Sequence, residues 1–176
     1  HPVKSRRSGH RYIRETLRHH VRQAGLLRID HVMGLARQWW VPAGMAATAG
    51  CYVRYPLEEM FAIAVLEAHL AGAVIVGENL GTVPPEIDSG LHEHRLLGIS
   101  VMLETLFSYG SDHRRTAPAN SMAMSSTHDT VPFAGFWWGA DIDIAHRLGL
   151  VGDEERGRQF GWRERMRERV IDHLRG

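Results

Sequence analysis

The run AVIVGENLG at residues 73–81 restricts the fold more than any other segment of the sequence. Residues 74–76 are consecutive apolar residues without polar alternation, which is typical of a strand covered on both faces in a parallel sheet. A second short apolar run, LLRID at residues 26–30, ends in charged residues. Residues 56–70, between the two runs, have the apolar spacing of a helix, with Pro56 in its first turn. Strand, helix and strand in this order form the crossover unit of a parallel sheet.

Hydrophobic spacing predicts further elements along the chain. The residues expected to be buried on helices are Tyr12, Ile13, Leu17 and Val21 over residues 8–24, and Leu57, Met60, Phe61, Val65 and Leu66 over residues 56–70. The other expected elements are a helix over 84–94, strands over 98–103 and 121–127, a terminal helix over 154–175, a loop over 43–50, and a loop with a little helix over 104–120.

Four parallel strands alternating with helices fit either an open doubly wound sheet or part of a barrel. Three of these strands are followed by an acidic residue, namely Asp30, Glu78 or Asp129. In a (β/α)8 barrel the carboxyl ends of the strands carry the catalytic groups, so this pattern favours the barrel. A complete barrel takes about 250 residues, whereas the chain has 176. We therefore expect an α/β fold, a partial TIM-type barrel that forms a single domain over residues 1–176.

Composition argues against several classes of function. Lysine and arginine number 21 against 20 acidic residues with the signs interspersed, so neither nucleic acid nor a membrane is indicated as a partner. The single cysteine, Cys51, excludes an internal disulfide framework, and no stretch approaches the ~18 consecutive apolar residues of a membrane span. A cytoplasmic location is expected. The chain begins with His1 and lacks a signal-peptide pattern, so we expect it to be part of a longer protein.

Acidic residues at the ends of neighbouring strands suit glycoside chemistry. In the retaining route, one carboxylate attacks the anomeric carbon and a second, protonated carboxyl donates to the leaving oxygen, with the two groups about 5–5.5 Å apart. Asp30 and Glu78, on adjacent strands about 4.8 Å apart, would meet this requirement. Arg28 precedes Asp30 by two residues, so it points to the same side of the strand and would keep the aspartate ionised.

These features also have structural interpretations. Arg28 and Asp30 alone would be an ion pair at a strand end, but the matching positions of Glu78 and Asp129 favour catalysis. The segment GENLG could belong to a phosphate-binding loop, but it has neither a third glycine nor a lysine at phosphate-loop spacing. Nucleotide binding is therefore poorly supported. His128 alone would be a half-buried histidine, whereas its neighbour Asp129 favours a site.

Histidines raise the question of a metal site. The chain has 12 of them, and the candidate pairs are His19 with His20 and His92 with His94. Adjacent histidines on a helix point in different directions, and neither pair has a second cluster at zinc-site spacing, so no metal is expected.

Aromatic and arginine residues complete the set of candidates. The tryptophans in expected loops past the strand ends could belong either to the core or to a sugar-stacking surface: Trp39, Trp40, Trp137 and Trp138. The same two alternatives apply to Tyr52. The arginines of the terminal helix are expected to form a solvated face: Arg163, Arg165, Arg167 and Arg169.

Taken in order, the motifs resemble the amylomaltase family, the 4-α-glucanotransferases related to α-amylases. The resemblance rests on LRIDHVMGL with WVPAG, on GENLGTVPPEI, on GISVM, and on STHDT followed by GFWWG, and it covers roughly residues 10–150. It implies the C-terminal half of the catalytic barrel, without the family's first strands or its last. The family often has aspartate at the position of Asn79, and HFRG where this chain has HVMG with Val32 and Met33.

The resemblance also implies roles for individual residues. Asp30 would be the nucleophile, Glu78 the general acid and base, and Asp129 the carboxylate that holds the distorted sugar. The substrate-binding residues would be Arg28, which also supports Asp30, together with His31, His128, Trp39 and Tyr52.

The expected function is transfer of α-1,4-glucan segments between maltooligosaccharides through a covalent glucosyl-enzyme, which requires no cofactor. Three alternatives stay open: an α-glucan hydrolase with water as acceptor, a catalytically silent fragment of such an enzyme, and a nonenzymatic glucan-binding module that uses the tryptophans. The exposed sheet edges of a half-barrel would favour self-association.

Overall fold

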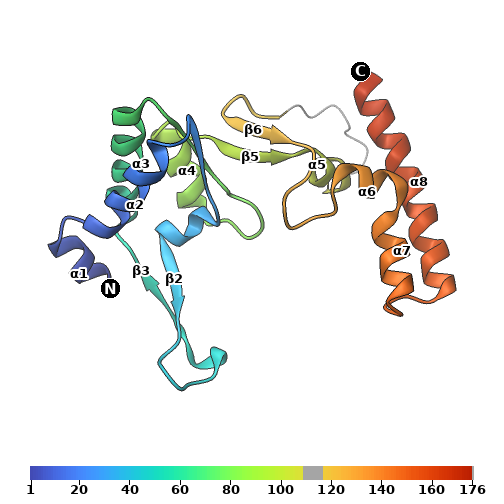
Figure 1. Cartoon of the computed structure of the whole chain (residues 1–176), viewed down its shortest axis with the longest axis horizontal. Coiled ribbons are helices and arrows are strands. Elements are labelled where there is room, and N and C mark those ends of the chain that lie inside the picture. Colours follow the sequence, from blue (N-terminus) through green and yellow to red (C-terminus); the bar gives the residue numbers. More distant parts are fainter. Residues whose placement is uncertain (109–116, 176) are drawn as a thin grey trace. The chain divides into compact units, whose positions relative to one another are not determined.

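The computed structural model describes residues 1–108 and 117–175. The chain divides into two compact units (Figure 1). Unit 1 comprises residues 1–99 and 119–122, and unit 2 comprises residues 100–118 and 123–176.

Unit 1 consists of short strands, helices and one hairpin. Its elements are α1 (Pro2–Arg7), α2 (Arg11–Val21), β1 (Leu26–Ile29), the 3-10 helix η1 (Val32–Leu35), β2 (Arg37–Trp40), the 3-10 helix η2 (Ala47–Ala49), β3 (Cys51–Arg54), α3 (Leu57–Ala71), β4 (Val74–Gly77) and α4 (Pro85–Glu93). Two more strands, β5 (Gly98–Val101) and β6 (Ser121–Met124), begin in unit 1 and continue into unit 2.

Parallel strands form the centre of unit 1, as predicted. β1 and β4 pair in parallel along all four residues of each strand. A parallel bridge joins Val76 to Leu97, directly before β5, and β5 is paired with β6. Ile75 and Val76 are 2% and 0% exposed, as expected for a strand covered on both faces, whereas Val74 at the start of the strand is 45% exposed. The prediction of an α/β fold with parallel strands is therefore confirmed.

Helix α3 covers this core as its apolar spacing predicted. It begins after Pro56 and ends at Gly72, whose φ of 65° lies in the left-handed region that glycine adopts easily. Phe61 is fully buried in a cluster with residues of α2, β4 and α4. Two residues predicted to be buried on helices are exposed instead, Tyr12 to 84% and Leu66 to 50%. Each lies one residue, or about 100° of helical rotation, away from the buried stripe of its helix.

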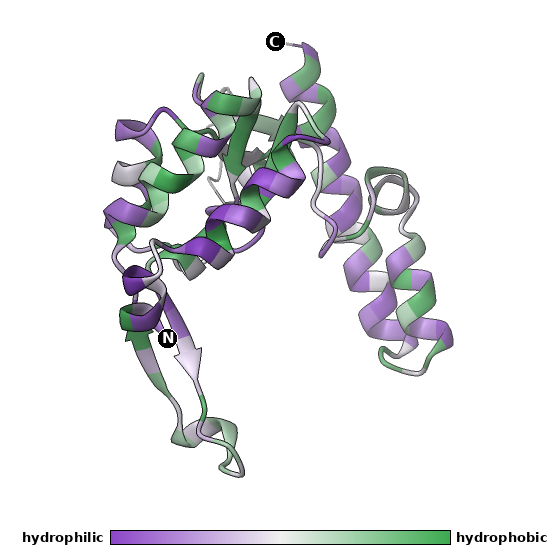
Figure 2. Ribbon diagram, turned by 60° about the vertical axis from the view of Figure 1, so that its left-hand side comes forward, coloured by the Kyte–Doolittle hydropathy of each residue, from purple (hydrophilic) through white to green (hydrophobic). Residues whose placement is uncertain are grey.

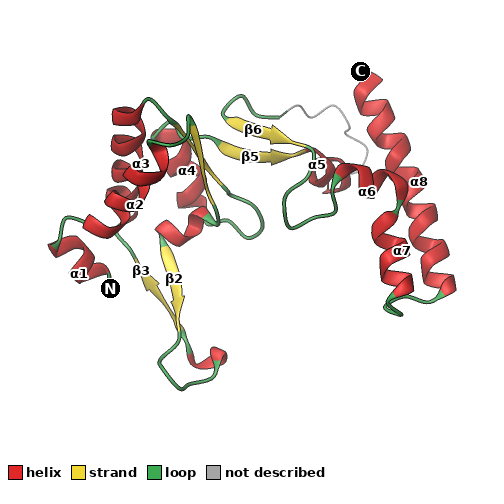
Figure 3. Cartoon of the chain, viewed as in Figure 1, coloured by secondary structure: helices red, strands yellow, loops and turns green. Residues whose placement is uncertain are grey.

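The segment between η1 and α3 forms an antiparallel hairpin that the sequence did not predict. β2 pairs with β3, and Trp39 lies opposite Tyr52. The expected loop over 43–50 is the connection between these strands and contains η2. The hairpin extends away from the helices of its unit (Figure 3). Each strand has only four residues and is largely exposed on both faces, so neither produces a clear alternating pattern.

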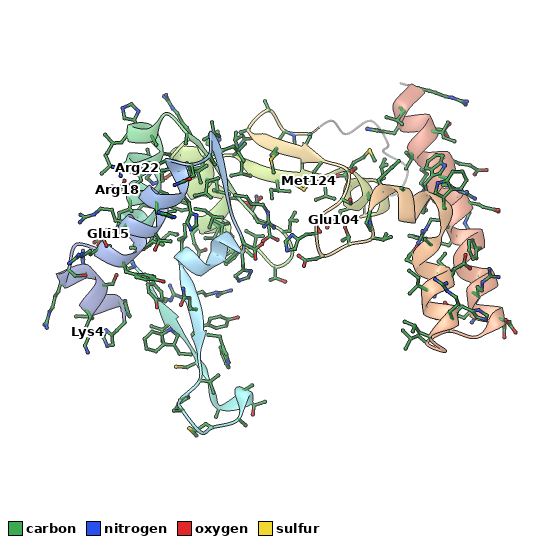
Figure 4. All side chains as sticks on the ribbon, in the orientation of Figure 1. Lys4, Glu15, Arg18, Arg22, Glu104 and Met124 are labelled. Atoms are coloured by element: carbon green, nitrogen blue, oxygen red, sulfur yellow. The ribbon has the colours of Figure 1, made fainter. Side chains whose placement is uncertain are left out.

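An ion pair joins α2 to α3. The Glu67 side chain is 1% exposed, and Arg18 donates to it twice, from Nε at 2.8 Å and from Nη2 at 2.7 Å. Figure 4 labels Arg18 on α2. Hydrogen bonding from Arg18 lowers the pKa of Glu67 below its ordinary value of 4.5; burial opposes this effect and the arginine charge adds to it. The pair satisfies a carboxylate that would otherwise be buried without a partner.

Unit 2 is mainly helical. Besides its parts of β5 and β6, its elements are α5 (Met102–Ser108), α6 (Phe133–Trp138), α7 (Ala140–Arg147) and α8 (Asp153–Arg175). The terminal helix and the strand beginning at residue 121 are thus confirmed. The segment 104–120, expected to be a loop with a little helix, begins within α5, and its residues 109–116 lie outside the described residues. No helix in the described part of the chain has the length and apolar character needed to cross a membrane.

Arg163 contradicts the expectation of a solvated arginine face on α8. Its side chain is buried, whereas Arg165 is exposed. It donates to both Asp141 oxygens, at 2.9 and 2.7 Å, and to the main-chain oxygen of Phe136 at 2.6 Å, and its guanidinium lies 4.5 Å from the Phe136 ring centre. The hydrogen bonds from Arg163 to Asp141 lower the pKa of the Asp141 carboxyl. Hydrophilic residues occupy most of α8 (Figure 2), so its sequence does not distinguish the buried arginine from the others.

The Arg18–Glu67 pair predicts a pH-dependent stability. Because folding lowers the pKa of Glu67, its stabilising contribution is complete above the unfolded-state pKa, near 4.5, and is lost as the pH falls through the lower folded-state value. Urea unfolding of the wild type and of Glu67→Gln should therefore show a free-energy difference that is largest near pH 7 and shrinks toward pH 3. A difference that stays constant over this range would contradict the prediction.

The buried Arg163 predicts that two arginines two positions apart on α8 differ in their effect. Arg163→Met should lower the free energy of unfolding by about 3 kcal/mol, because it leaves Asp141 and the Phe136 carbonyl without their partner. The matched control Arg165→Met should change it by no more than about 0.5 kcal/mol. Thermal and urea unfolding measure the change in the free energy of unfolding for each variant. Equal losses in the two variants would contradict a stabilising role for the buried contacts of Arg163.

Candidate active site

The carboxyl ends of β1 and β4 bring three charged side chains together. Arg28 lies on β1, Asp30 follows this strand, and Glu78 follows β4. The Arg28 guanidinium contacts both carboxylates: Nη1 lies 2.5 Å from Oδ1 of Asp30, and Nη2 lies 3.3 Å from Oε2 of Glu78. Ile29 pairs with Gly77 in the parallel register, so the residues that follow them become neighbours at the same edge.

The main chain around His31 fixes the position of Glu78. The His31 N–H donates to Oε2 of Glu78 at 2.6 Å. His31 has φ 46° and ψ 63°, a left-handed conformation that is uncommon for a residue other than glycine. The Glu78 N–H donates to Ile29 O at 2.9 Å, and Val32 N–H donates to Glu78 O at 3.0 Å. The predicted site residue His31 thus contacts Glu78 through its main chain, and its side chain is exposed.

The two carboxylates differ in their surroundings. The Asp30 side chain is 65% exposed, whereas Glu78 is 14% exposed. An accessible carboxylate is suited to attack a carbon atom, and an enclosed one with fixed hydrogen bonds is suited to transfer a proton. The two carboxylates at this edge therefore differ both in their access to solvent and in how firmly they are held.

The motif STHDT forms a turn after β6 within unit 2. Thr130 Oγ1 accepts from the Thr127 N–H at 3.0 Å and donates to Thr127 O at 3.1 Å, while Thr127 Oγ1 accepts from the Asp129 N–H at 3.3 Å. His128 Nε2 lies 3.3 Å from Oδ1 of Asp129, and both side chains are exposed. The turn presents the predicted residues His128 and Asp129 to solvent.

Trp39 and Tyr52 lie on the β2–β3 hairpin, whereas the sequence placed Trp39 in a loop. Their ring centres are 5.0 Å apart in an edge-to-face contact, and the Arg37 guanidinium lies 4.6 Å from the centre of the Tyr52 ring. Trp39 Nε1 donates to Ala47 O at 3.0 Å, which ties the indole to the hairpin connection. The two rings are 47% and 58% exposed, so together they form an aromatic surface open to a ligand.

The remaining tryptophans of the candidate set also lie in regular structure. Trp40 is on β2, and Trp137 and Trp138 are on α6. Trp137 stacks on Phe133 at 5.8 Å and packs against the core of unit 2, whereas Trp138 is 73% exposed. Trp137 is therefore partly buried against the core, and Trp138 is available at the surface.

The predicted site residues occur in three groups. They are Arg28, Asp30, His31 and Glu78 in unit 1, Trp39 and Tyr52 on the hairpin of the same unit, and His128 and Asp129 in unit 2. No cluster of three or more His, Cys, Asp or Glu that could hold a metal ion occurs among the residues that the structure describes.

Asn79 makes a contribution that the sequence did not reveal. It stood out only as a departure from the family pattern, but its side chain bonds both to α4 and to the beginning of β5. The available signal was its position directly after Glu78.

Comparisons with known proteins agree with the motifs. A family model described as 4-alpha-glucanotransferase matches residues 1–174. Among similar proteins, a 4-alpha-glucanotransferase of Haemophilus influenzae is 34% identical over 150 residues, which cover 85% of this chain and 22% of that protein. One of Mycobacterium bovis is 39% identical over 142 residues, which cover 74% of this chain and 19% of that protein.

A solved structure resembles the chain along nearly its whole length. The crystal structure of amylomaltase from Corynebacterium glutamicum matches 98% of this chain with a TM-score of 0.84 and 29% identity, and the match covers 25% of that protein. The chain spans about a fifth to a quarter of the length of these relatives. Because the family model covers almost every residue, the chain belongs to the 4-alpha-glucanotransferase family.

Proposed function

We propose that the chain carries the catalytic carboxylates of a 4-α-glucanotransferase, an enzyme that moves α-1,4-glucan segments between maltooligosaccharides by a retaining double displacement. The observation that carries the proposal is the Arg28 guanidinium shared by Asp30 and Glu78 at the ends of adjacent parallel strands. Membership of the family and the names of the relatives support the same reaction.

In the first half of the reaction, the Asp30 carboxylate attacks the anomeric carbon of the donor glucan. The glycosidic bond breaks as Glu78 gives its proton to the leaving oxygen, and a covalent glucosyl-enzyme forms. In the second half, the Glu78 carboxylate removes a proton from a hydroxyl of the acceptor glucan. This oxygen attacks the anomeric carbon, the bond to Asp30 breaks, and the configuration is retained. The reaction needs no cofactor.

The other predicted residues act on the substrate in this proposal. Arg28 supports the carboxylate of Asp30 and contacts the donor sugar. Asp129 holds the distorted sugar through its hydroxyl groups. His31 and His128 bind the donor sugar. Trp39 and Tyr52 stack against sugar rings, and their exposure on the hairpin supports this role.

The proposal extends to the fold and the setting of the enzyme. The 176 residues form one partial catalytic domain, a segment of a (β/α)8 barrel without the family's first strands and its last. The likeness to the Corynebacterium glutamicum amylomaltase and the alternation of parallel strands with helices support this arrangement. The cytoplasmic location, inferred from the single cysteine, and self-association through exposed sheet edges stay predictions.

The first test incubates the purified 176-residue chain with maltotriose and separates the products by size. Transfer gives a ladder of shorter and longer oligomers, whereas hydrolysis gives mainly glucose and maltose. Asp30→Asn should reduce product formation by roughly 10⁴-fold or more, as the loss of a nucleophile does in other enzymes. A folded wild-type chain that gives no products would contradict activity in the isolated chain and favour the catalytically silent fragment.

The second test separates the roles of the two carboxylates. Glu78→Gln should lose transfer from maltotriose, because the leaving glucan oxygen needs a proton. With α-maltosyl fluoride as the donor, fluoride leaves without protonation as the anomeric carbon bonds to Asp30. The same variant should therefore still form the covalent glycosyl-enzyme, since Asp30 is intact. Mass spectrometry of the protein would detect the added maltosyl group. Asp30→Asn is the matched control and should show no adduct; an adduct there and none in Glu78→Gln would reverse the assignment.

A further inference from the structure

The hydrogen-bond ladder beside β4 changes at Asn79. Leu97 N–H donates to Ile75 O at 3.1 Å, and Gly77 N–H donates to Leu97 O at 2.8 Å. In a regular parallel ladder the next donor, Ile99 N–H, would bond to the carbonyl of Gly77. It donates instead to the side-chain Oδ1 of Asn79, at 2.8 Å. A side chain therefore takes the place of the main chain at the point where β4 ends.

The nitrogen of the same amide is also bonded. Nδ2 of Asn79 donates to Oδ1 of Asp88 on α4 at 2.8 Å. The contact with β5 is close, since a Cβ added at Gly98 would lie 2.9 Å from Oδ1 and 3.1 Å from Nδ2 of Asn79. Asn79, which directly follows Glu78, thus connects α4 to β5.

Glu78 is held from the opposite side by β1. Its N–H donates to Ile29, its carbonyl accepts from Val32, and its carboxylate accepts from the His31 N–H. Bonds on the β1 side and on the β5 side together restrict the main chain of Glu78. We propose that Asn79 is a positioning residue that sets the placement of the Glu78 carboxylate. The importance of this placement for turnover rests on the proposed function of Glu78.

An amide suits this position because it both accepts and donates. A carboxylate at position 79 could accept from the Ile99 N–H but could not donate to Asp88. Two carboxylates facing each other at this distance would repel unless they shared a proton. Asn79 keeps the connection intact without that proton.

The test exchanges the two partners and reads the result by NMR of the 176-residue chain at neutral pH. The variants are Asn79→Asp, Asp88→Asn and the double variant Asn79→Asp with Asp88→Asn. The Ile99 amide signal reports the bond to position 79. The His31 amide signal reports the placement of the Glu78 carboxylate, because it donates to Glu78 and not to Asn79.

Asn79→Asp should shift both amide signals. The double variant should restore both, because the amide at position 88 then donates to the carboxylate at position 79, which still accepts from Ile99. Asp88→Asn alone is the matched control and should leave both signals near their wild-type positions, since two amides can still form the bond. Gly98→Ala keeps Asn79 but crowds its amide, so it should also move the His31 signal; this second variant decides the question if Asn79→Asp does not fold.

Kinetics with maltotriose give the second readout. Asn79→Asp should lower kcat by about 10- to 100-fold, the loss expected when a reacting group is displaced by about an ångström, with little change in KM, and the double variant should recover most of it. An Ile99 signal that moves while the His31 signal and kcat stay constant would overturn the proposal, because Asn79 would then only attach α4 to β5. A wild-type chain without transfer activity would count against the proposed function, while the two amide signals would still decide the positioning role.

Discussion

The parallel pairing of β1 with β4 is the constraint on which the candidate site depends. It sets two strand ends side by side, so that Asp30 and Glu78 leave the sheet as neighbours. Two carboxylates at one edge would repel each other, and the guanidinium of Arg28, which forms an ion pair with each of them, offsets that repulsion. One positive side chain on β1 therefore allows two acidic groups to occupy the same edge of the sheet.

Arginine has a similar role within the body of each unit. In unit 1, Arg18 satisfies the buried carboxylate of Glu67, and in unit 2 the buried Arg163 bonds to Asp141. Each pair joins two helices through two parallel hydrogen bonds, for which a planar guanidinium is better suited than an ammonium group. Removing one partner leaves a charge without compensation, so these contacts specify which helices pack together as well as how tightly they do so.

The proposed chemistry follows from a difference in environment at one edge. Asp30 is open to an approaching sugar, whereas Glu78 is enclosed and is held by main-chain bonds from β1 and by the neighbouring amide of Asn79. A nucleophile needs access and an acid–base group needs a fixed direction for proton transfer. Trp39 and Tyr52, on a hairpin of the same unit, add an exposed aromatic surface of the kind that sugars stack on.

The sequence by itself determined the parallel strands, most of the helices, and the residues at the strand ends, because these depend on local spacing and on the order of apolar runs. It also identified Arg28 as a partner of Asp30, since residues two apart on a strand point to the same side. Only the tertiary structure decided that Arg163 is buried, that Glu67 pairs with Arg18, that residues 37–54 form a hairpin, and that Asn79 completes the ladder of β5. Each of these features depends on a partner distant in sequence or on pairing between short strands. Hydrophobic periodicity indicates which face of an element is covered, but it does not indicate which polar group lies across the contact.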